Sequence, residues 1–217
     1  GQGAAADAGL QEPAAEGDEV GDLASAGRGV LQRLVDGTLS LNGGFGDDAG
    51  EIARADCAIL LRRFDRDGER RIPFLSAMSM LGSKDRETRS YLEIVDALRQ
   101  HGAAPKADME ALWRRLVFNI LISNTDDHLR NHGFLYEGQA GWRLSHAYDL
   151  NPVPTDIKPR ILSTAINEDD NTASLALAME VAGYFELDDG KARDIAKQVG
   201  KAVSKWRDEA VRHGLAK

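Results

Sequence analysis

The stretch 119–138, NILISNTDDHLRNHGFLYEG, says most about how this chain folds. An apolar run ends at Asn124, and 124–132 then holds two carboxylates, two imidazoles and two carboxamides before the chain becomes apolar again. Charged side chains are rarely buried without partners. This polar loop (124–132) is therefore either a solvated turn or a functional site, and its surroundings decide between the two.

The residues before the polar loop predict one long helix over 107–124. Apolar side chains recur there at helical spacing, at i, i+3, i+4, i+7, i+8, i+11 and i+12, namely Met109, Leu112, Trp113, Leu116, Val117, Ile120 and Leu121. Asp108 lies near the expected start, where an acidic residue suits a helix N-terminus. Such a helix runs through the core and presents the polar loop at its C-terminal end.

The residues after the polar loop predict a β-hairpin. The short apolar runs 134–136 and 142–144 flank a turn bounded by glycines. The second strand leads toward Asp149, and Pro152 and Pro154 then end it. We therefore expect the hairpin to bring Asp149 back beside the polar loop.

The remaining pattern predicts a mainly α fold with a small β element. Helices are expected over 84–102, ending at Gly102, and over 171–187 and 188–214, capped by Asn171 or Thr172 and by Asp188. A buried strand from Cys57 leads into a charged Asp-Gly turn. Residues 1–56 are polar and rich in glycine, and we interpret them as a flexible or partial small-lobe segment, with the main domain spanning 57–217.

Composition restricts the classes of function. The net charge is −8, and residues 1–50 contribute nine acids against two arginines, so broad nucleic-acid binding is not expected. No apolar run reaches the length of a membrane span and no signal segment opens the chain. A single cysteine excludes an intramolecular disulfide and a multi-cysteine metal site. These features are typical of a soluble cytoplasmic protein without a membrane partner.

The spacing within the polar loop indicates phosphoryl transfer. Asp126 precedes Asn131 by five positions, which is the spacing of the kinase catalytic loop D-x-x-x-x-N. In that chemistry one carboxylate accepts the hydroxyl proton, while a second carboxylate and a carboxamide oxygen hold magnesium. Asp126 as base, with Asn131 and Asp149 as metal ligands, supplies this set.

Three segments carry a specific resemblance. The sequences "NTDDHLRNHGFL", "WRLSHAYDLNPVP" and "ILLRRFDRDGERR" resemble the HipA family of toxin–antitoxin serine/threonine kinases, as do the helical runs near the C-terminus. The resemblance covers 57–217. It implies a kinase-like large lobe of the HipA C-terminal type, with ATP and Mg²⁺ as cofactors.

The resemblance also implies roles for individual residues of the polar loop and the strand after it. Asp126 is the expected catalytic base, and His128 is expected to order the loop near the nucleotide phosphates. Asn131 and Asp149 are the expected magnesium ligands. Tyr148 and Asp149 form the Tyr-Asp pair that replaces the Asp-Phe-Gly of other kinases.

A second group of implied residues belongs to the hinge. Arg62, Arg63 and Phe64 are expected to line the adenine pocket, and Asp65 stands where the family's hinge acid contacts ribose. Arg62 departs from the acid that some members carry. The first lysine of the sequence is Lys84, so the usual small lobe with its phosphate-binding lysine is expected to be reduced or missing.

The family implies partners as well. Its members phosphorylate proteins, including aminoacyl-tRNA synthetases, and bind a small DNA-binding antitoxin. Two hypotheses follow for this chain. The first is an active protein kinase of the toxin type, and the second is a catalytically impaired large lobe that binds an antitoxin or a separate small-lobe subunit.

Plainer interpretations compete at some positions. His128 and His132 lie four apart and would chelate zinc if the segment were helical, although Gly133 favours a loop. Asp127 is expected to be solvated and outside the chemistry. Trp113, Trp142 and Tyr148 are expected in the core, and the glycine-rich 41–50 is expected to be a turn, because no G-K-[ST] completes a phosphate-binding loop.

Overall fold

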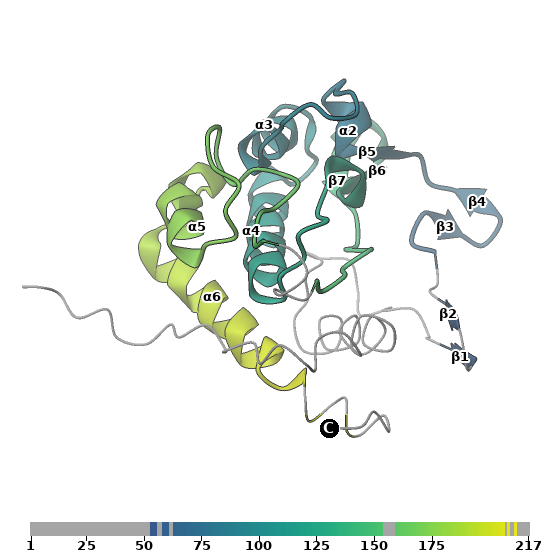
Figure 1. Ribbon diagram of the computed structural model, residues 1–217. Helices are drawn as coiled ribbons and strands as arrows, with labels where there is room; N and C mark the ends of the chain where they lie inside the picture. Colours follow the sequence, from purple (N-terminus) through teal and green to yellow (C-terminus); the bar gives the residue numbers. More distant parts are fainter. Residues whose placement is uncertain are drawn as a thin grey trace, which may run out of the picture.

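The computed structural model describes residues 53–55, 58–60, 63–153, 159–206, 208 and 211, so predictions for 1–52, Cys57 and Arg62 lie outside it. Figure 1 shows the elements, which in chain order are β1 Ala53–Ala55, β2 Ala58–Leu60, β3 Arg66–Asp67, β4 Arg70–Arg71, β5 Phe74–Ser76, α2 Ala77–Met80, α3 Tyr91–His101, α4 Pro105–Leu121, η1 Leu129–Asn131, β6 Gly133–Tyr136, η2 Gly138–Ala140, β7 Trp142–Leu144, α5 Leu175–Val181, η3 Ala182–Phe185 and α6 Asp189–Val203.

Helix α4 is the centre of the molecule. It contacts α3, α5, α6 and β7, and Figure 1 shows it between the α5–α6 pair and the sheet. Its apolar repeat is buried as the sequence predicts, except for the half-buried Leu121. The helix begins at Pro105, a residue that suits the first helical position because its missing N–H is not needed there.

Asp108 lies in the first turn of α4, as the sequence predicts. It is buried and accepts hydrogen bonds from Arg143 Nε at 2.9 Å and from the Leu144 backbone N–H at 3.1 Å. These partners on β7 were not predicted. The Asp108 carboxylate links the start of α4 to β7 by hydrogen bonds. A buried carboxylate is tolerated there because it is paired and hydrogen-bonded.

Helix α3 begins later than the sequence pattern suggests. Ser90 is its N-cap, and Glu93 completes a capping box by accepting from the Ser90 N–H at 2.9 Å. Residues 84–89, predicted to be helical, form a loop instead. The end of the helix at Gly102 and its buried stripe, Tyr91, Leu92, Val95 and Leu98, are as predicted.

A three-stranded antiparallel sheet lies next to α4. Its order is β5–β6–β7, with Leu75 opposite Phe134 and Leu135 opposite Arg143. The β6–β7 hairpin is the predicted one. The sequence did not predict β5. This strand precedes α3 and α4 in the chain and pairs with β6, which follows them. Upstream, the predicted Asp-Gly turn, with Gly68 at φ +57°, joins β3 and β4 in a hairpin that was not predicted.

The C-terminal helices close the other side of α4. Helix α5 is capped by Ser174, not by Asn171 or Thr172, and α6 is capped by Asp188 as predicted. Phe185 packs edge-on against Trp113 with ring centroids 5.5 Å apart. No helix in the described ranges is long and apolar enough to cross a membrane. The result is a helical domain with a small sheet at one side.

Candidate functional site

The polar loop is held in place by the segment that follows Pro159. The Ser163 N–H and hydroxyl both donate to the Thr125 carbonyl, at 3.1 and 2.9 Å, and the Thr164 N–H donates to the Asp127 carbonyl at 3.1 Å. These bonds satisfy the backbone of the loop where it leaves α4. The loop is therefore a fixed structure between two segments and not a solvated turn.

Asp126 and Asn131 are tied together inside this loop. Asn131 Nδ2 donates to the Asp126 carbonyl at 3.1 Å, while the N–H of His128 donates to the same oxygen at 3.0 Å. The bond uses the amide nitrogen of Asn131 and leaves Oδ1 as its remaining acceptor. The side chain of Asp126 is exposed. The loop therefore presents a free carboxylate beside an oriented carboxamide.

Asp127 is buried, whereas the sequence suggested a solvated side chain. Only 1% of its surface is exposed, its carboxylate accepts from the Tyr91 hydroxyl, and His132 Nε2 lies 3.0 Å from its Oδ1. Asn119 donates to the Tyr91 hydroxyl at 3.1 Å and extends the network. The expectation of a solvated residue was wrong, because Tyr91 on the remote α3 and His132 at the end of the polar loop supply partners for this carboxylate.

The electrostatics of Asp127 follow from these partners. Burial raises the pKa of Asp127, but the nearby His132 and the hydrogen bonds from His132, Tyr91 and Asn119 lower it more, so the net pKa lies below the ordinary value. Burial, followed by the charge of Asp127, raises the pKa of Tyr91. The tyrosine therefore stays protonated and remains a donor to the carboxylate.

Asp149 lies in the irregular segment that follows β7. It is exposed, has a φ of +56°, and accepts from Asn151 Nδ2 at 2.6 Å. Left-handed backbone is uncommon outside glycine, although aspartate tolerates it, and it concentrates at functional positions. The hydroxyl of the preceding Tyr148 donates to the Arg130 carbonyl. The polar loop is thus bonded to the residue that precedes Asp149.

An aromatic cluster is formed by Phe64, Phe74, His146 and Tyr148. Phe64 from the hinge stacks on His146 at 5.5 Å with an interplanar angle of 18°, and its ring lies 5.7 Å from Tyr148 and 6.2 Å from Phe74. Gly133 makes room for it, since a Cβ there would lie 2.3 Å from the Phe74 ring. No pattern in the sequence indicated His146 or Phe74 as members of this cluster, because their ring contacts depend on where the fold places Phe64 of the hinge.

The protonation of this cluster is set by burial. Burial, and then the charge of Arg115, lowers the pKa of His146, and burial raises the pKa of Tyr148 to about 12. Arg115 itself is buried on α4 and donates to the Ser145 carbonyl, and burial lowers its pKa to about 10. A neutral imidazole and a protonated phenol leave the cluster an uncharged aromatic surface.

The other hinge residues do not join the rings. Arg63 Nε donates to Asp65 Oδ1 at 2.7 Å, and both side chains form an ion pair. That bond is the largest cause of the lowered pKa of Asp65. Arg62 lies outside the described residues. Phe64 is thus the hinge residue that the structure places against Tyr148.

His128 lines a pocket with Leu129 and Arg130. His128 and His132 would chelate zinc only in a helix, as the sequence indicates, whereas the structure has a short 3-10 turn over Leu129–Asn131 between them, and His132 is buried against Asp127. No group of three or more His, Cys, Asp or Glu that could hold a metal ion occurs within the described ranges. The donors available for a hard cation are the exposed Asp149 carboxylate and the Asn131 Oδ1, a set that fits magnesium bound mainly through substrate phosphates.

Comparisons with known proteins agree on one relationship. The model of the family described as HipA-like C-terminal domain matches residues 46–206. A protein of Haemophilus influenzae named "Putative kinase" is 25% identical over 142 residues, which are 59% of this chain and 41% of that protein. A solved structure of HipA from Shewanella oneidensis MR-1, in complex with HipB and operator DNA, superposes with a TM-score of 0.61 at 18% identity, over 83% of this chain and 49% of that one.

The likeness to the solved structure establishes the fold, and it covers only part of that structure. The chain spans less than half the length of each of these relatives. The matched part includes the polar loop, the hairpin and the helices around α4.

Proposed function

Because the chain belongs to the family of HipA-like C-terminal domains, we propose that it carries the catalytic lobe of a protein serine/threonine kinase that uses ATP and Mg²⁺. The observation that best supports this proposal is the bond from Asn131 Nδ2 to the Asp126 carbonyl. It holds the Asn131 side chain against the backbone of Asp126, and the two residues have the D-x-x-x-x-N spacing of the kinase catalytic loop.

In this proposal Asp126 is the general base. Its carboxylate takes the proton of the acceptor hydroxyl while the acceptor oxygen bonds to the γ-phosphorus and the bond to the bridging oxygen breaks, which releases ADP. Asp126 suits this role because it is exposed and its carboxylate makes no hydrogen bond within the described part of the chain. It stays free to accept a proton.

Asn131 and Asp149 are the proposed ligands of the metal. The Nδ2 bond of Asn131 leaves Oδ1 available. Asp149 is exposed and follows Tyr148, whose hydroxyl donates to the Arg130 carbonyl of the loop. Magnesium would neutralise charge on the β- and γ-phosphates. His128 follows Asp126 by two positions, and we propose that it orders the acceptor side of the loop.

The aromatic cluster is the proposed adenine surface. Phe64 and Tyr148 offer apolar faces, and burial keeps both Tyr148 and its neighbour His146 uncharged. A planar, neutral base stacks well on such rings. Arg63 and Asp65 are bound to each other at the rim, where a ribose or phosphate would compete for either partner.

The partners and setting of the protein are proposed by analogy. The Shewanella oneidensis protein is solved with HipB and operator DNA, and we propose that this chain acts in the cytoplasm, as part of a toxin–antitoxin pair, and is neutralised by a small DNA-binding antitoxin. Its substrate would be a protein, with aminoacyl-tRNA synthetases as the first candidates to test. We expect no direct contact with nucleic acid.

The test combines nucleotide binding with phosphate transfer. Calorimetry with ATP should show binding that strengthens with Mg²⁺, and labelled phosphate should reach an added protein acceptor. Asp126→Asn should bind ATP as the wild type does and transfer about 10²–10⁴-fold more slowly. Equal transfer by this variant would remove Asp126 as the base.

A second function is favoured by one feature of the sequence. The first lysine is Lys84, whereas kinases hold the phosphates with a lysine that precedes the hinge. A chain that binds ATP weakly, transfers nothing alone and becomes active with a lysine-bearing small-lobe subunit would be a binding module in an assembled kinase. Robust transfer by the chain alone would exclude this alternative.

A further inference from the structure

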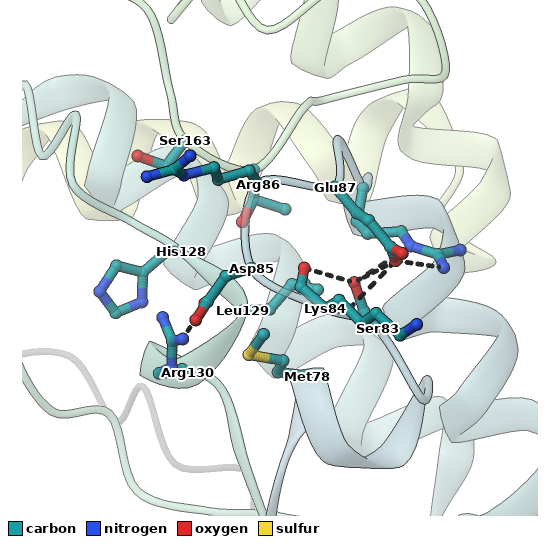
Figure 2. A pocket seen from close by; sticks show the side chains of 12 residues that line it. Met78, Ser83, Lys84, Asp85, Arg86, Glu87, His128, Leu129, Arg130 and Ser163 are labelled. Carbon is teal, nitrogen blue, oxygen red and sulfur yellow. Dashed lines mark hydrogen bonds and ion pairs between the residues drawn. The ribbon is translucent and has the colours of Figure 1, made fainter.

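A pocket of about 180 Å³ lies beside the polar loop, whose residues His128, Leu129 and Arg130 line it. Figure 2 shows it between three segments, the loop before α3 (83–89), the residues 128–130 and the pair 163–164. We refer to it as the basic pocket. Phe64, Asn131, Tyr148 and Asp149 do not line it, whereas His128, which we place on the acceptor side of the loop, does. The adenine surface and the metal ligands proposed above are therefore separate from this pocket.

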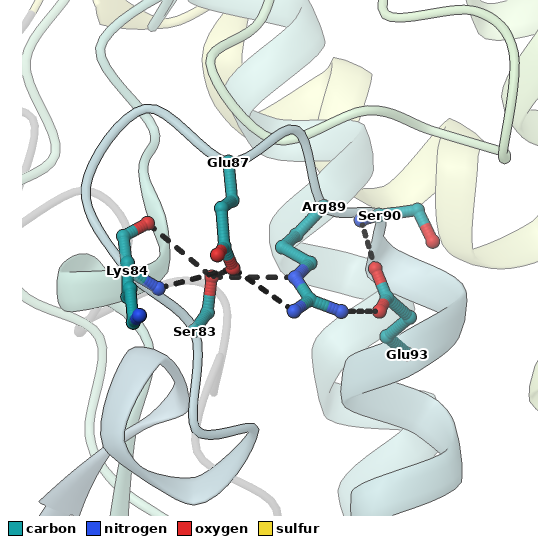
Figure 3. Close-up of polar contacts among 6 residues, drawn as sticks. All are labelled: Ser83, Lys84, Glu87, Arg89, Ser90 and Glu93. Atoms are coloured by element: carbon teal, nitrogen blue, oxygen red, sulfur yellow. Dashed lines mark hydrogen bonds and ion pairs between the residues drawn. The ribbon is translucent and has the colours of Figure 1, made fainter.

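The wall formed by 83–89 is prearranged. Glu87 Oε2 accepts from the Lys84 N–H and the Ser83 hydroxyl, both at 3.1 Å, and from Arg89 at 3.0 Å (Figure 3). Arg89 also donates to Glu93 on α3 at 2.7 Å. These bonds fix the loop against α3. Because this wall is already ordered, binding of a ligand would cost less conformational entropy in the loop.

The basic pocket carries an excess of positive charge. Four of its lining residues are Lys or Arg and two are acidic. Arg89 is engaged by Glu87, and Arg130 pairs with Asp85 across the pocket (Figure 2). Both acids are therefore neutralised by the arginines that they contact.

Two cations remain without such a partner. Lys84 and Arg86 are exposed, and neither side chain forms an ion pair or hydrogen bond with another described residue. Arg86 is also held at φ +70°, an unusual backbone conformation for a residue with a side chain. The loop thus presents two free positive charges at the mouth of the pocket.

The pocket also contains buried polar atoms that lack partners. Thr164 is 1% exposed and its Oγ1 makes no hydrogen bond with any described residue, and the same holds for His128 Nδ1. Buried polar groups are normally satisfied, so each such atom needs an explanation. A ligand that accepts hydrogen bonds would satisfy Thr164 from within the pocket.

The position of the pocket identifies the ligand. His128 and Arg130 belong to the same loop as Asp126, the proposed base, so a group in the pocket lies within a few residues of the acceptor hydroxyl. The size suits the end of one side chain and excludes an extended polymer. We propose that the basic pocket receives an anionic side chain, carboxylate or phosphate, that flanks the acceptor serine or threonine of the protein substrate.

This inference rests on the proposed kinase function and adds a substrate preference to it. The test uses fluorescent peptides with one serine flanked by aspartates, by asparagines or by phosphoserines, presented to the full chain. The pocket variant is Lys84→Glu/Arg86→Glu, which keeps a Cβ at the left-handed position. The control is Arg193→Glu/Lys197→Glu, an equal change of charge at exposed positions on α6.

The expected result has three parts. The aspartate peptide binds on the order of tenfold more tightly than the asparagine peptide, as a charge-assisted contact implies. The pocket variant loses this preference and the control keeps it. ATP affinity by calorimetry is the same in all three proteins. The phosphoserine peptide distinguishes a phosphate preference from a carboxylate preference.

Failures of the two proposals give different results. Equal binding of the aspartate and asparagine peptides, or an unchanged preference in the pocket variant, overturns the basic pocket even if phosphate is transferred. Charge-selective binding without transfer to any peptide, by the chain alone or with a lysine-bearing small-lobe subunit added, overturns the kinase function and with it the acceptor role of the pocket. Selectivity lost equally in the control shows a general charge effect and also overturns the inference.

Discussion

Replacing Asp127 by asparagine should destabilise the protein strongly, whereas the same replacement at Asp126 should leave its stability unchanged. The two residues are adjacent and chemically identical in the sequence. Asp127 is 1% exposed and contacts Tyr91 and His132, while Asp126 is exposed and its carboxylate has no hydrogen bond within the described part of the chain. The pair therefore provides its own matched control.

The magnitude follows from burial. Removing one partner of a buried charged pair costs roughly 3–5 kcal/mol, because the other partner is left uncompensated. Asparagine keeps the shape and one acceptor of Asp127, so we expect about 3 kcal/mol, the lower end of that range. A surface change such as Asp126→Asn stays within about 0.5 kcal/mol. For a chain of this size the Asp127 variant should melt about 6–12 °C lower.

The dependence on pH gives a second measurement. The pKa of Asp127 is lower in the folded protein than its ordinary value, so its contribution is complete above the unfolded pKa of about 3.9. It is lost as the pH falls through the folded pKa. The difference in unfolding free energy between wild type and Asp127→Asn should therefore be constant near neutral pH and shrink below about pH 4.

Urea unfolding followed by circular dichroism measures both quantities. Wild type, Asp126→Asn and Asp127→Asn are compared at neutral pH and then at a series of lower pH values. A loss of stability in Asp126→Asn equal to that in Asp127→Asn would refute the assignment of the buried and exposed carboxylates. A difference that grows in acid would refute the sign of the pKa shift.

Three further outcomes are expected. Asp149→Asn should weaken the Mg²⁺-dependent part of ATP binding without changing the melting temperature, and calorimetry with and without Mg²⁺ would show unchanged affinity if Asp149 is not a ligand. Gly133→Ala should cost about 1–3 kcal/mol in urea unfolding, because its Cβ would lie 2.3 Å from the Phe74 ring, and a neutral effect would contradict that packing. Tyr148→Phe should cost about 0.5–1.5 kcal/mol through its lost bond to the Arg130 carbonyl, and equal urea midpoints would show that this bond contributes nothing.

Much of the fold could be predicted from local sequence patterns. The apolar repeat of α4, the stop of α3 at Gly102 and the strands around the glycine-bounded turn each depend on residues close together in the chain. The start of α3 could not be located this way. Residues 84–89 have helical composition, but the capping box of Ser90 and Glu93 begins the helix after them.

The site was predictable only where a short motif carried it. Asp126 and Asn131 lie within one loop, so their spacing indicated their relation. The contact of Asp127 with Tyr91, the pairing of Asp108 with Arg143 and the stacking of His146 on Phe64 all join residues from distant segments. No local pattern records such contacts, since the same side chain is buried or solvated according to what the rest of the chain brings to it.

The pairing of β5 with β6 has a consequence for how the protein folds and opens. The two strands lie side by side but are separated in sequence by all of α3 and α4. Closing so long a loop costs entropy before the strand contacts form, so we expect the helices to assemble first and β5 to dock late. In hydrogen exchange, the amides of β5 should accordingly open at a lower free energy than those of α4, because an edge strand can detach while the helical core stays intact.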